Sequence, residues 1–384
     1  MTKKVWILLD QPLDTRNRER FGVNSYLHSN VLAGVIDLTR LTHPLVYADF
    51  LSRGASIDSV GVKYFSPSHF YEIVSYFYKF SDCDYLIYLS DNSFASSLIG
   101  LFCLWRGTKV VHFLFSFPQP SRSLSPLRII RKLRAIPRLT RNVLFNFFVP
   151  KDVVILTTSL NEKNYKKLRA QKFYSHALDY DLFLADQMDC SVQSPSCKNI
   201  ITFIDEDMLN HANYIQQNIV PSITKDNYFA SLDNFFTALE SQFDINVVVA
   251  EHPRSRYSNS QKNEYFYGRT VIASQTYSLI KNSLFVVSHS SKSIDIAVLL
   301  RKPIILLTTN EIKLCSRQSP LIKSFSELLG IPIVNSDCPT SFDNIAHLLS
   351  FSNSLYDRYI DTYIKHPESA CNLSNADLIK SNLL

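Results

Sequence analysis

A short stretch from Val247 to Tyr257, VVVAEHPRSRY, passes directly from four apolar residues into charged ones. The apolar residues are typical of a buried strand, and Pro253 ends it, which places His252 and Arg254 just beyond the strand. Arg256 follows two residues later. Histidine can transfer a proton near neutral pH, and arginine binds phosphate oxygens with paired hydrogen bonds. The stretch predicts phosphate binding with proton transfer; the alternative is a loop of solvated charges.

Small hydroxyl residues crowd the end of another predicted strand, in LFVVSHSSKSIDIAVLLRKPIILL from Leu284 to Leu307. We expect that strand to end at Ser288 and a helix to begin near Ile294. Unpaired N–H groups at a helix start attract anions, and small side chains let a phosphate come close. The pattern predicts a phosphate-binding turn, and N-capping of the helix is the plainer alternative. The predicted donor-binding residues here are Ser288, Ser290, Ser291, Lys292 and Ser293.

Carboxylates form a third cluster, in TFIDEDMLNHANY from Thr202 to Tyr214. Asp205, Glu206 and Asp207 directly follow a predicted strand. Neighbouring carboxylates raise one another's pKa, which suits a general base or a nucleophile. They equally suit the start of a helix, where negative charge is favourable. We assign catalysis to Asp205 or Glu206, without choosing between them.

A fourth segment, DQPLDTRNRERFG, follows the first predicted strand of the chain. Side chains at such a strand end can meet a ligand, so Asp10, Gln11, Arg16 and Arg18 are weaker candidates for binding an acceptor. A solvated loop is the ordinary explanation of the same residues.

Apolar runs of strand length alternate with segments of helical spacing along the whole chain. In the first half, strands are predicted at 5–10, 44–50, 85–90, 109–116 and 153–159, and helices at 24–41 and 93–107. In the second half, strands are predicted at 199–205, 245–251, 269–274, 284–290 and 302–308. Helices are expected up to residue 243, at 275–281 and at 294–300, with one or two closing helices within 341–364.

This alternation predicts an α/β protein with two Rossmann-like domains that face each other across a cleft. We place an N-terminal acceptor domain at 1–190 and a C-terminal donor domain at 191–384, which includes the closing helices. Ligands of open α/β sheets bind beyond the carboxyl ends of the strands, where the clusters lie. The sequence contains no G-x-G-x-x-G and no P-loop, which disfavours dinucleotide oxidoreductases and P-loop kinases.

With these residues in place, the chain resembles bacterial GT-B glycosyltransferases that use CMP-activated ulosonic acids. These are the sialyltransferases, polysialyltransferases and Kdo transferases of surface polysaccharide assembly, which carry an acidic D/E-D/E-G motif, a His-Pro motif and a paired serine motif. The same order is met here by Asp205-Glu206, His252-Pro253 and Ser290-Ser291. The resemblance covers roughly residues 201–307 by motif, and Asp207 stands where the acidic motif has glycine.

The resemblance implies the GT-B fold and transfer of an ulosonic acid to a glycan acceptor of lipopolysaccharide or capsule. It implies that Asp205 is the catalytic carboxylate, as a base or as a nucleophile. His252 would contact the departing CMP phosphate, and Ser290 and Ser291 would hold it. Apart from the resemblance, a CMP leaving group departs with one phosphate charge, which His252, Arg254 and a helix N-terminus can neutralise, so no cofactor and no metal ion are expected.

Four alternatives stay open. The serine turn also resembles that of polyol phosphate transferases that use CDP-glycerol. Enzymes of this fold that use UDP-sugars commonly place an acid on the helix after the phosphate loop, and Asp295 meets that description. A non-hydrolysing UDP-sugar epimerase shares the two-domain shape. A non-catalytic, membrane-docked assembly protein is the fourth.

Charge is distributed unevenly along the chain. The net charge of +6 is modest, and we expect no nucleic-acid partner. The segment 122–151 contains no acidic residue and interleaves apolar side chains with basic ones: Arg122, Arg128, Arg131, Lys132, Arg134, Arg138, Arg141 and Lys151. This predicts contact with the inner surface of the cytoplasmic membrane, with a packed helical hairpin as the alternative.

The 7 cysteines are odd in number and form no C-x-x-C pair, which favours reduced thiols and argues against a zinc site. The N-terminal apolar run, VWILL, is shorter than the hydrophobic region of a signal peptide. We therefore expect a cytoplasmic protein, peripheral on the membrane.

Overall fold

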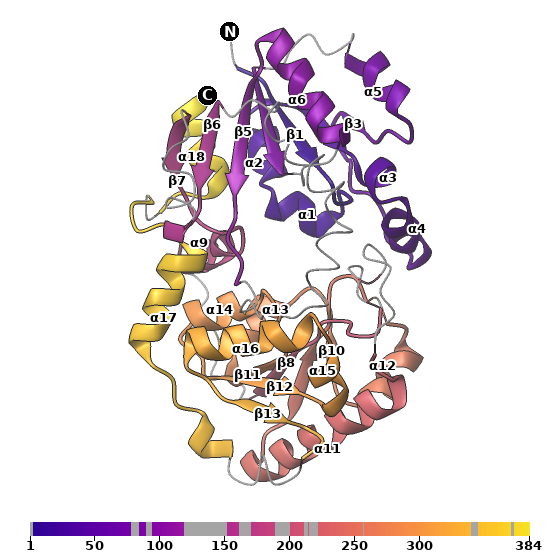
Figure 1. Ribbon diagram of the computed structural model, residues 1–384, viewed down its shortest axis with the longest axis vertical. Coiled ribbons are helices and arrows are strands. Elements are labelled where there is room, and N and C mark those ends of the chain that lie inside the picture. Colours follow the sequence, from indigo (N-terminus) through magenta and orange to yellow (C-terminus); the bar gives the residue numbers. More distant parts are fainter. Residues whose placement is uncertain are drawn as a thin grey trace, which may run out of the picture. The chain divides into compact units, whose positions relative to one another are not determined.

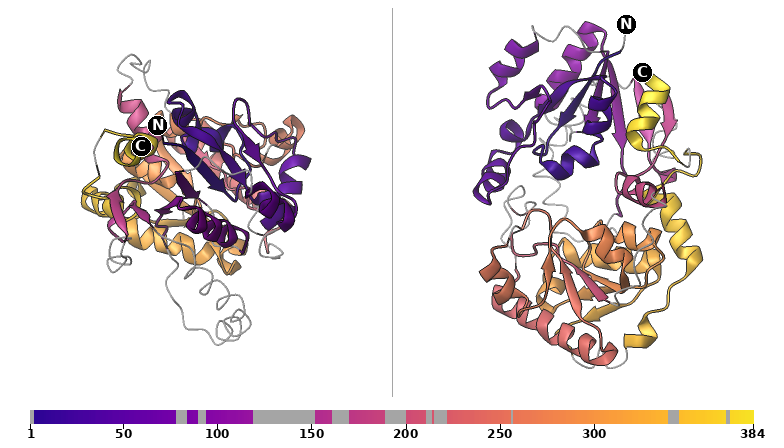
Figure 2. Two further views of the ribbon diagram at one scale, coloured as in Figure 1. Left: turned by 90° about the horizontal axis from the view of Figure 1, so that it is seen from above. Right: turned by 180° about the vertical axis from the view of Figure 1, so that it is seen from behind.

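The computed structural model describes residues 3–77, 84–89, 94–118, 152–160, 170–188, 200–210, 214, 222–255, 257–338, 345–369 and 372–384. The chain divides into two compact units. The first unit consists mainly of residues up to Asp181 and also includes Lys365–Leu384 at the end of the chain. The second consists mainly of Leu182–Ile364. Each unit is a parallel sheet covered by helices, as Figures 1 and 2 show.

The sheet of the first unit has the strand order β3-β2-β1-β4-β5-β6-β7, and its strands pair in parallel. Buried side chains of β1, β2, β4, β5 and β6 form its core. Its strands are β1 Val5–Leu9, β2 Leu32–Asp37, β3 Tyr64–Phe65, β4 Tyr85–Leu89, β5 Lys109–Leu114, β6 Val153–Leu156 and β7 Gln171–Tyr174. Its helices are α1 Thr15–Arg20, α2 Val23–His28, α3 Thr39–Thr42, α4 Pro44–Ser52, α5 Phe70–Phe77, α6 Phe94–Arg106 and α18 Asn375–Leu383, and α9 Tyr180–Met188 contains the boundary.

Two predicted elements of this unit are wrong. The stretch 44–50, predicted as a strand, lies in helix α4, because Pro44 occupies its first turn, where the missing N–H costs nothing. The stretch 24–41, predicted as one helix, contains α2 and then strand β2. Asn30 has φ 54° and turns the chain after α2. A side chain at Gly34 in β2 would meet the Trp6 ring at 2.5 Å, so the strand needs glycine there.

The sheet of the second unit has the order β10-β9-β8-β11-β12-β13, again with parallel pairing. Its strands are β8 Ile200–Ile204, β9 Val247–Ala250, β10 Val271–Ile272, β11 Ser283–Ser288, β12 Ile304–Thr308 and β13 Ile333–Asn335. Its α-helices are α11 Lys225–Phe243, α12 Asn259–Tyr265, α13 Thr276–Lys281, α14 Ile294–Leu299, α15 Asn310–Leu314, α16 Gln318–Leu329 and α17 Asn353–Tyr359. A 3₁₀ turn, Ile345–Leu348, and a π-helical turn, Ile360–Ile364, complete it. The strands predicted around the three motifs are confirmed.

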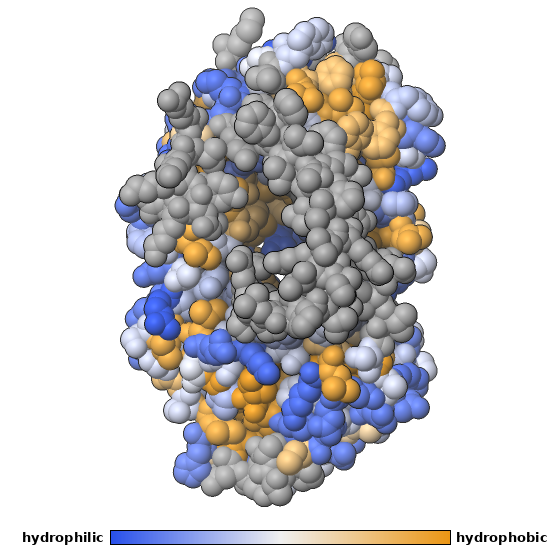
Figure 3. Space-filling view, in the orientation of Figure 1, coloured by the Kyte–Doolittle hydropathy of each residue, from blue (hydrophilic) through white to orange (hydrophobic). Residues whose placement is uncertain are grey.

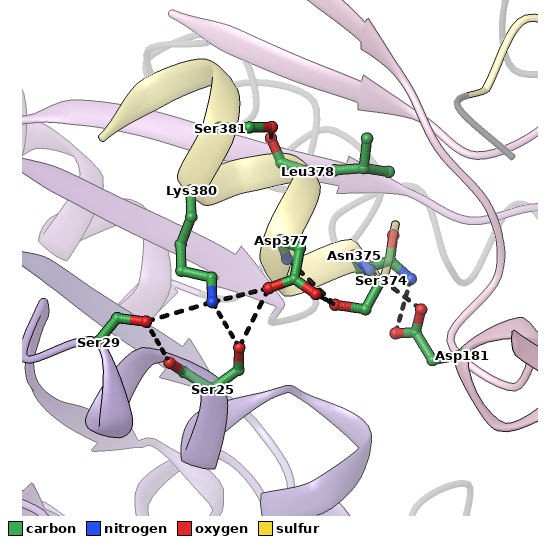
Figure 4. A network of polar contacts seen from close by, with 9 residues as sticks. All are labelled: Ser25, Ser29, Asp181, Ser374, Asn375, Asp377, Leu378, Lys380 and Ser381. Atoms are coloured by element: carbon green, nitrogen blue, oxygen red, sulfur yellow. Dashed lines mark hydrogen bonds and ion pairs between the residues drawn. The ribbon is translucent and has the colours of Figure 1, made fainter. Parts of the chain in front are cut away.

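The predicted domain boundary is wrong for the end of the chain. Lys365–Leu384 belongs to the first unit and not to the predicted C-terminal domain. Figure 4 shows the polar contacts that hold α18: Asn375 donates to the Asp181 carboxylate, and Lys380 donates to Ser25 Oγ at 2.8 Å. Apolar residues of α18 join the core beneath them. At Gly22 an added Cβ would lie 2.8 Å from Ala376, so the contact requires a glycine.

The division within the chain also falls at Asp181 and Leu182, close to the predicted position of 190. Among the described helices, none is both long and apolar enough to cross a membrane.

Candidate active site

Three of the four sequence clusters meet because of the strand order in the second unit. Strand β8 lies between β9 and β11 and pairs in parallel with both. The acidic cluster follows β8, the His-Pro stretch follows β9, and the serine turn follows β11. The carboxyl ends of these strands therefore bring all three clusters to one edge of one sheet. The strand order reverses between β8 and β11, which is where open α/β sheets bind ligands.

Asp205 is buried, with 2% of its surface exposed. Its Oδ1 accepts from the Asp207 N–H at 3.1 Å, and its Oδ2 accepts from the His252 N–H at 3.3 Å. The Tyr257 hydroxyl donates to Oδ2 at 3.1 Å. Burial, and next the negative charge of Asp207, raise the pKa of Asp205 to about 7. A carboxyl group that titrates near neutral pH is suited to accept a proton.

Asp207 stands where the resembled acidic motif has glycine. Its φ is 47°, in the left-handed region that most side chains avoid. Glycine adopts this conformation at no steric cost, and aspartate is among the few other residues that tolerate it. The turn after β8 therefore has a backbone shape that the glycine of the resembled motif would also permit.

Glu206 points to the opposite neighbour, strand β11. Its Oε1 accepts from the Ser290 N–H at 2.5 Å and from Ser288 Oγ at 3.4 Å, and its Oε2 accepts from Ser290 Oγ at 3.1 Å. Burial raises the pKa of Glu206, and these hydrogen bonds oppose that shift. The two adjacent acids thus have different partners: Asp205 contacts the β9 loop, and Glu206 contacts the β11 loop.

His252 is half-buried at the end of β9, and its backbone position is set by Glu251. The buried Glu251 carboxylate accepts from Ser255 Oγ at 3.1 Å and from the Tyr257 N–H at 2.9 Å, and it pairs with Lys262 at 2.7 Å. His252 Nδ1 accepts from the Arg254 N–H at 3.3 Å. A neutral ring that accepts at Nδ1 carries its proton on Nε2, so Nε2 can donate to a ligand.

The remaining predicted donor-binding residues lie near this edge and differ in their partners and burial. Ser291 Oγ accepts from the Ser293 N–H at 3.3 Å, which stabilises the turn before α14. Lys292 pairs with the fully buried Asp295 at 2.6 Å, so its charge is balanced within the protein. Arg254 is half-buried beside His252, and Arg256 lies outside the described residues.

His289, which lies between Ser288 and Ser290, is part of the buried core. It is fully buried, its Nδ1 bonds the Leu307 carbonyl at 2.8 Å, and the Tyr228 hydroxyl lies 2.9 Å from its Nε2. Burial lowers its pKa to about 4, so the ring is neutral at physiological pH. In this state Nδ1 donates and Nε2 accepts, which fixes the ring.

Sequence reasoning missed four residues that shape the site. Glu251 and Tyr257 organise the loop after β9, as described above. Arg317, just before α16, is close enough to Glu206 and to Tyr214 for their charges to interact. Tyr214 in turn accepts from Gln318 Nε2 at 2.7 Å. Glu251 and Tyr257 flank the His-Pro stretch and were within reach of prediction, whereas Arg317 comes from a loop with no motif.

The predicted acceptor residues all lie in the first unit. Arg18 is buried and donates to Asp58 Oδ1 at 3.1 Å and to Asn24 Oδ1 at 2.7 Å, so its charge serves the fold. Asp10 and Gln11 are half-buried after β1, and Arg16 is exposed on α1. The structure thus brings together three of the four clusters within one unit and leaves the fourth in the other.

Within the ranges that the structure describes, no group of three or more His, Cys, Asp or Glu side chains is arranged to hold a metal ion. Three cysteines in these ranges are free thiols, of which Cys103 and Cys315 are buried and Cys338 is exposed.

Comparisons with known proteins define the fold. No protein-family model matches the sequence, and no curated protein matches it either. A variant of the wall teichoic acid polymerase TagF, soaked with CDPG, is 11% identical, with a TM-score of 0.53 over 99% of this chain and 87% of that chain. The same variant without CDPG gives 0.52 at the same identity and coverage. A UDP-N-acetylglucosamine 2-epimerase is 14% identical, with a TM-score of 0.49 over 99% of this chain and 95% of that one. The predicted GT-B fold, with two parallel α/β domains, is confirmed.

Proposed function

We propose that the protein is a glycosyltransferase that moves an ulosonic acid from a CMP-activated donor to a glycan acceptor of the bacterial surface. The supporting observation is that the acidic, His-Pro and serine motifs occupy the ends of the neighbouring strands β8, β9 and β11. A proton acceptor, a proton donor and phosphate-binding hydroxyls then lie around one edge of one sheet. That combination fits transfer with a phosphate leaving group.

Asp205 is the proton acceptor in this proposal. An acceptor hydroxyl has to reach Oδ2, to which the Tyr257 hydroxyl donates at 3.1 Å. Tyr257 also lies 3.5 Å from Asp207 Oδ1, so it has a second acceptor when it moves aside. The acceptor oxygen then bonds to the sugar carbon as its proton passes to Asp205. The bond between that carbon and the phosphate oxygen breaks, and CMP leaves.

His252 stabilises the departing phosphate. The Nε2–H of its neutral ring can donate to a phosphate oxygen, and a protonated ring can transfer the proton outright. Arg254 adds a positive charge beside it. Donors that the fold holds in place stabilise developing negative charge more strongly than water does.

A second donor class, CDP-glycerol, has one specific observation in its favour. Two solved structures of TagF have TM-scores above 0.5, and one of them was soaked with CDPG. Both donor classes carry cytidine. For UDP-sugars the expected ribose ligand, Asp295, is fully buried, accepts from the Tyr359 hydroxyl at 2.9 Å and pairs with Lys292. This arrangement leaves Asp295 poorly placed to bind ribose.

We further propose that the first unit docks on an anionic membrane surface. The basic segment 122–151, which lies outside the described residues, was predicted to do so from its sequence. Helices α5 and α6 add exposed apolar side chains, which gather on one face in Figure 3. Those between 39% and 71% exposed are Phe70, Tyr71, Val74, Phe94, Leu101 and Trp105. Arg106 lies 5.2 Å from the Trp105 ring, and aromatic side chains beside cations suit the headgroup region.

The test of the proposed function is nucleotide release from a panel of donors. CMP-Kdo, a CMP-sialic acid, CDP-glycerol and UDP-N-acetylglucosamine are each incubated with the protein and a bacterial surface-glycan fraction. We expect CMP release from a CMP-activated sugar and none from the Asp205→Asn variant. Release from UDP-N-acetylglucosamine alone would overturn the donor class, and release from CDP-glycerol alone would favour the second candidate.

A further inference from the structure

The side chain of Glu206 links the loop that follows β8 to the loop that follows β11. The chain runs from β8 outward to β9 and β10 on one side, and through β11 to β12 and β13 on the other. Ser288 in β11 is the register partner of Ile204 in β8, so the residues that follow both strands face each other. An anionic ligand at this switch point would have to use the groups that Glu206 already holds.

Those groups form a small nest of donors. The Ser290 N–H and Oγ, and Ser288 Oγ, all donate to the Glu206 carboxylate. Converging backbone and hydroxyl donors of this kind bind carboxylate and phosphate oxygens alike. Ser290 is only 7% exposed, so its donors cannot serve two anions at once.

We propose that Glu206 is an internal anion that occupies the seat of a donor phosphate, and that the phosphate binds only by displacing it. The acid next to Asp205 is then a specificity-determining residue and not a second catalytic carboxylate. A phosphate binds only if it interacts with the donors of Ser288 and Ser290 more favourably than the Glu206 carboxylate does. This inference rests on the proposed function for the identity of the donor, but not for the anion seat itself.

The charges around Glu206 come from several elements. Asp205 and Asp207 flank it in sequence, and Arg317, Tyr214 and Tyr228 are close enough for their ionisation to interact with its charge. His289 is neutral and faces Tyr228. Removing the Glu206 charge therefore changes both the occupancy of the nest and the local field, and an experiment has to separate the two effects.

Two substitutions make that separation. Glu206→Gln keeps the length of the side chain and removes the charge. Glu206→Asp keeps the charge but shortens the side chain by one methylene, which withdraws it from Ser290. If occupancy matters, both variants should bind an anion about tenfold more tightly than the unmodified protein, because each releases the Ser290 donors from the charge-assisted hydrogen bonds that occupy them. Tightening by Glu206→Gln alone would show a field effect and overturn the proposal.

The matched control is Glu311→Gln in the same unit. Its carboxylate also accepts a backbone N–H, from Thr224 at 2.8 Å, and a side-chain N–H, from Asn227 at 2.9 Å, but it does not contact the serine turn. We expect its anion affinity to be unchanged. The melting temperature of each variant without ligand reports that the fold is intact.

Calorimetric titration with CMP and, separately, with sulfate distinguishes the possible failures. Tighter binding of both probes by both Glu206 variants is the expected result. Tighter sulfate binding without any CMP binding would refute the proposed donor while leaving the anion seat intact. Weaker or unchanged binding of both probes in folded variants would show that Glu206 supports the nest and does not compete for it.

Discussion

Each unit contains a buried aspartate at or just beyond the carboxyl end of a strand, and the two have nearly the same partners. In the first unit Asp37 Oδ1 accepts from the Thr39 N–H at 2.8 Å and from Thr39 Oγ1, and its Oδ2 accepts from the Tyr64 hydroxyl. In the second unit Asp205 accepts from two N–H groups and from the Tyr257 hydroxyl. Burial raises the pKa of both.

The difference lies in what the neighbouring strands present. One donor to Asp37 is Thr39, at the start of helix α3, and the other is Tyr64 of the neighbouring strand β3. Beside Asp205, strand β9 presents the half-buried His252, and strand β11 presents a nest of hydroxyl and N–H donors. A buried carboxylate with a raised pKa is therefore not a site by itself. The groups at the adjacent strand ends make it one.

The largest expected effect separates these two aspartates directly. Asp205→Asn should lower turnover by about 10³-fold or more, within the range known for a lost general base and above it if Asp205 is a nucleophile. Asp37→Asn should leave turnover of the folded protein within about threefold, since its hydrogen bonds serve the local structure. Donor turnover at saturating substrate is the measurement. A loss of similar size in both variants would remove the distinction between the units.

His252 should give the next largest effect. His252→Ala is expected to lower turnover by roughly 10² to 10⁴, the scale for a lost acid or charge stabiliser. His43→Ala is the matched control, because His43 also precedes a proline but lies at the start of α4. His366 precedes a proline too, yet it is buried and stacks on Tyr174 at 4.1 Å, so His366→Ala should mainly reduce stability. Equal loss of turnover in His252→Ala and His43→Ala would contradict the assignment.

The pH dependence of stability gives a third test of Asp205. An unfolded aspartate ionises near pH 4, and Asp205 in the fold does so at about 7. Between these values the folded state binds more protons, so its contribution to stability falls as pH rises and is lowest above 7. Asp205→Asn removes this titration, which is worth up to about 4 kcal/mol. We expect the variant to gain several degrees in melting temperature relative to the unmodified protein between pH 5 and pH 8. If the difference in melting temperature between the two proteins did not change with pH, Asp205 would not be the titrating group.

The smallest predicted effect concerns membrane docking. Replacing Arg128 and Arg131 with glutamine should weaken binding to anionic vesicles, measured by sedimentation, by about thirtyfold, since each basic residue near the surface contributes about 1 kcal/mol. Replacing the exposed Lys313 and Lys323 in the same way should have little effect. Equal weakening by both pairs would indicate attraction by net charge alone, and loss of folding in the arginine pair would favour the packed hairpin.

Prediction from sequence worked best where a strand is buried on both faces. The strands around VVVAEHPRSRY and the serine turn stand where their β-branched residues and abrupt polar ends placed them, and the motif residues lie where parallel strands converge. It failed at 44–50, where apolar composition alone suggested a strand but Pro44 begins a helix. It also failed for α18, because packing of the chain end against Gly22 depends on residues more than 350 positions apart. The opposite orientations of Asp205 and Glu206 follow from which strands flank β8, and no local pattern encodes that order.

The central claim is that the strand ends of the second unit bind a cytidine nucleotide, and titration with free nucleotides tests it most directly. Calorimetry with CMP, CDP, UDP and GDP in the presence of a chelator needs neither the acceptor nor the sugar. We predict that CMP or CDP binds more tightly than UDP or GDP under these conditions. Tight UDP binding with none for CMP, or binding that appears only after Mn²⁺ is added, would contradict the account.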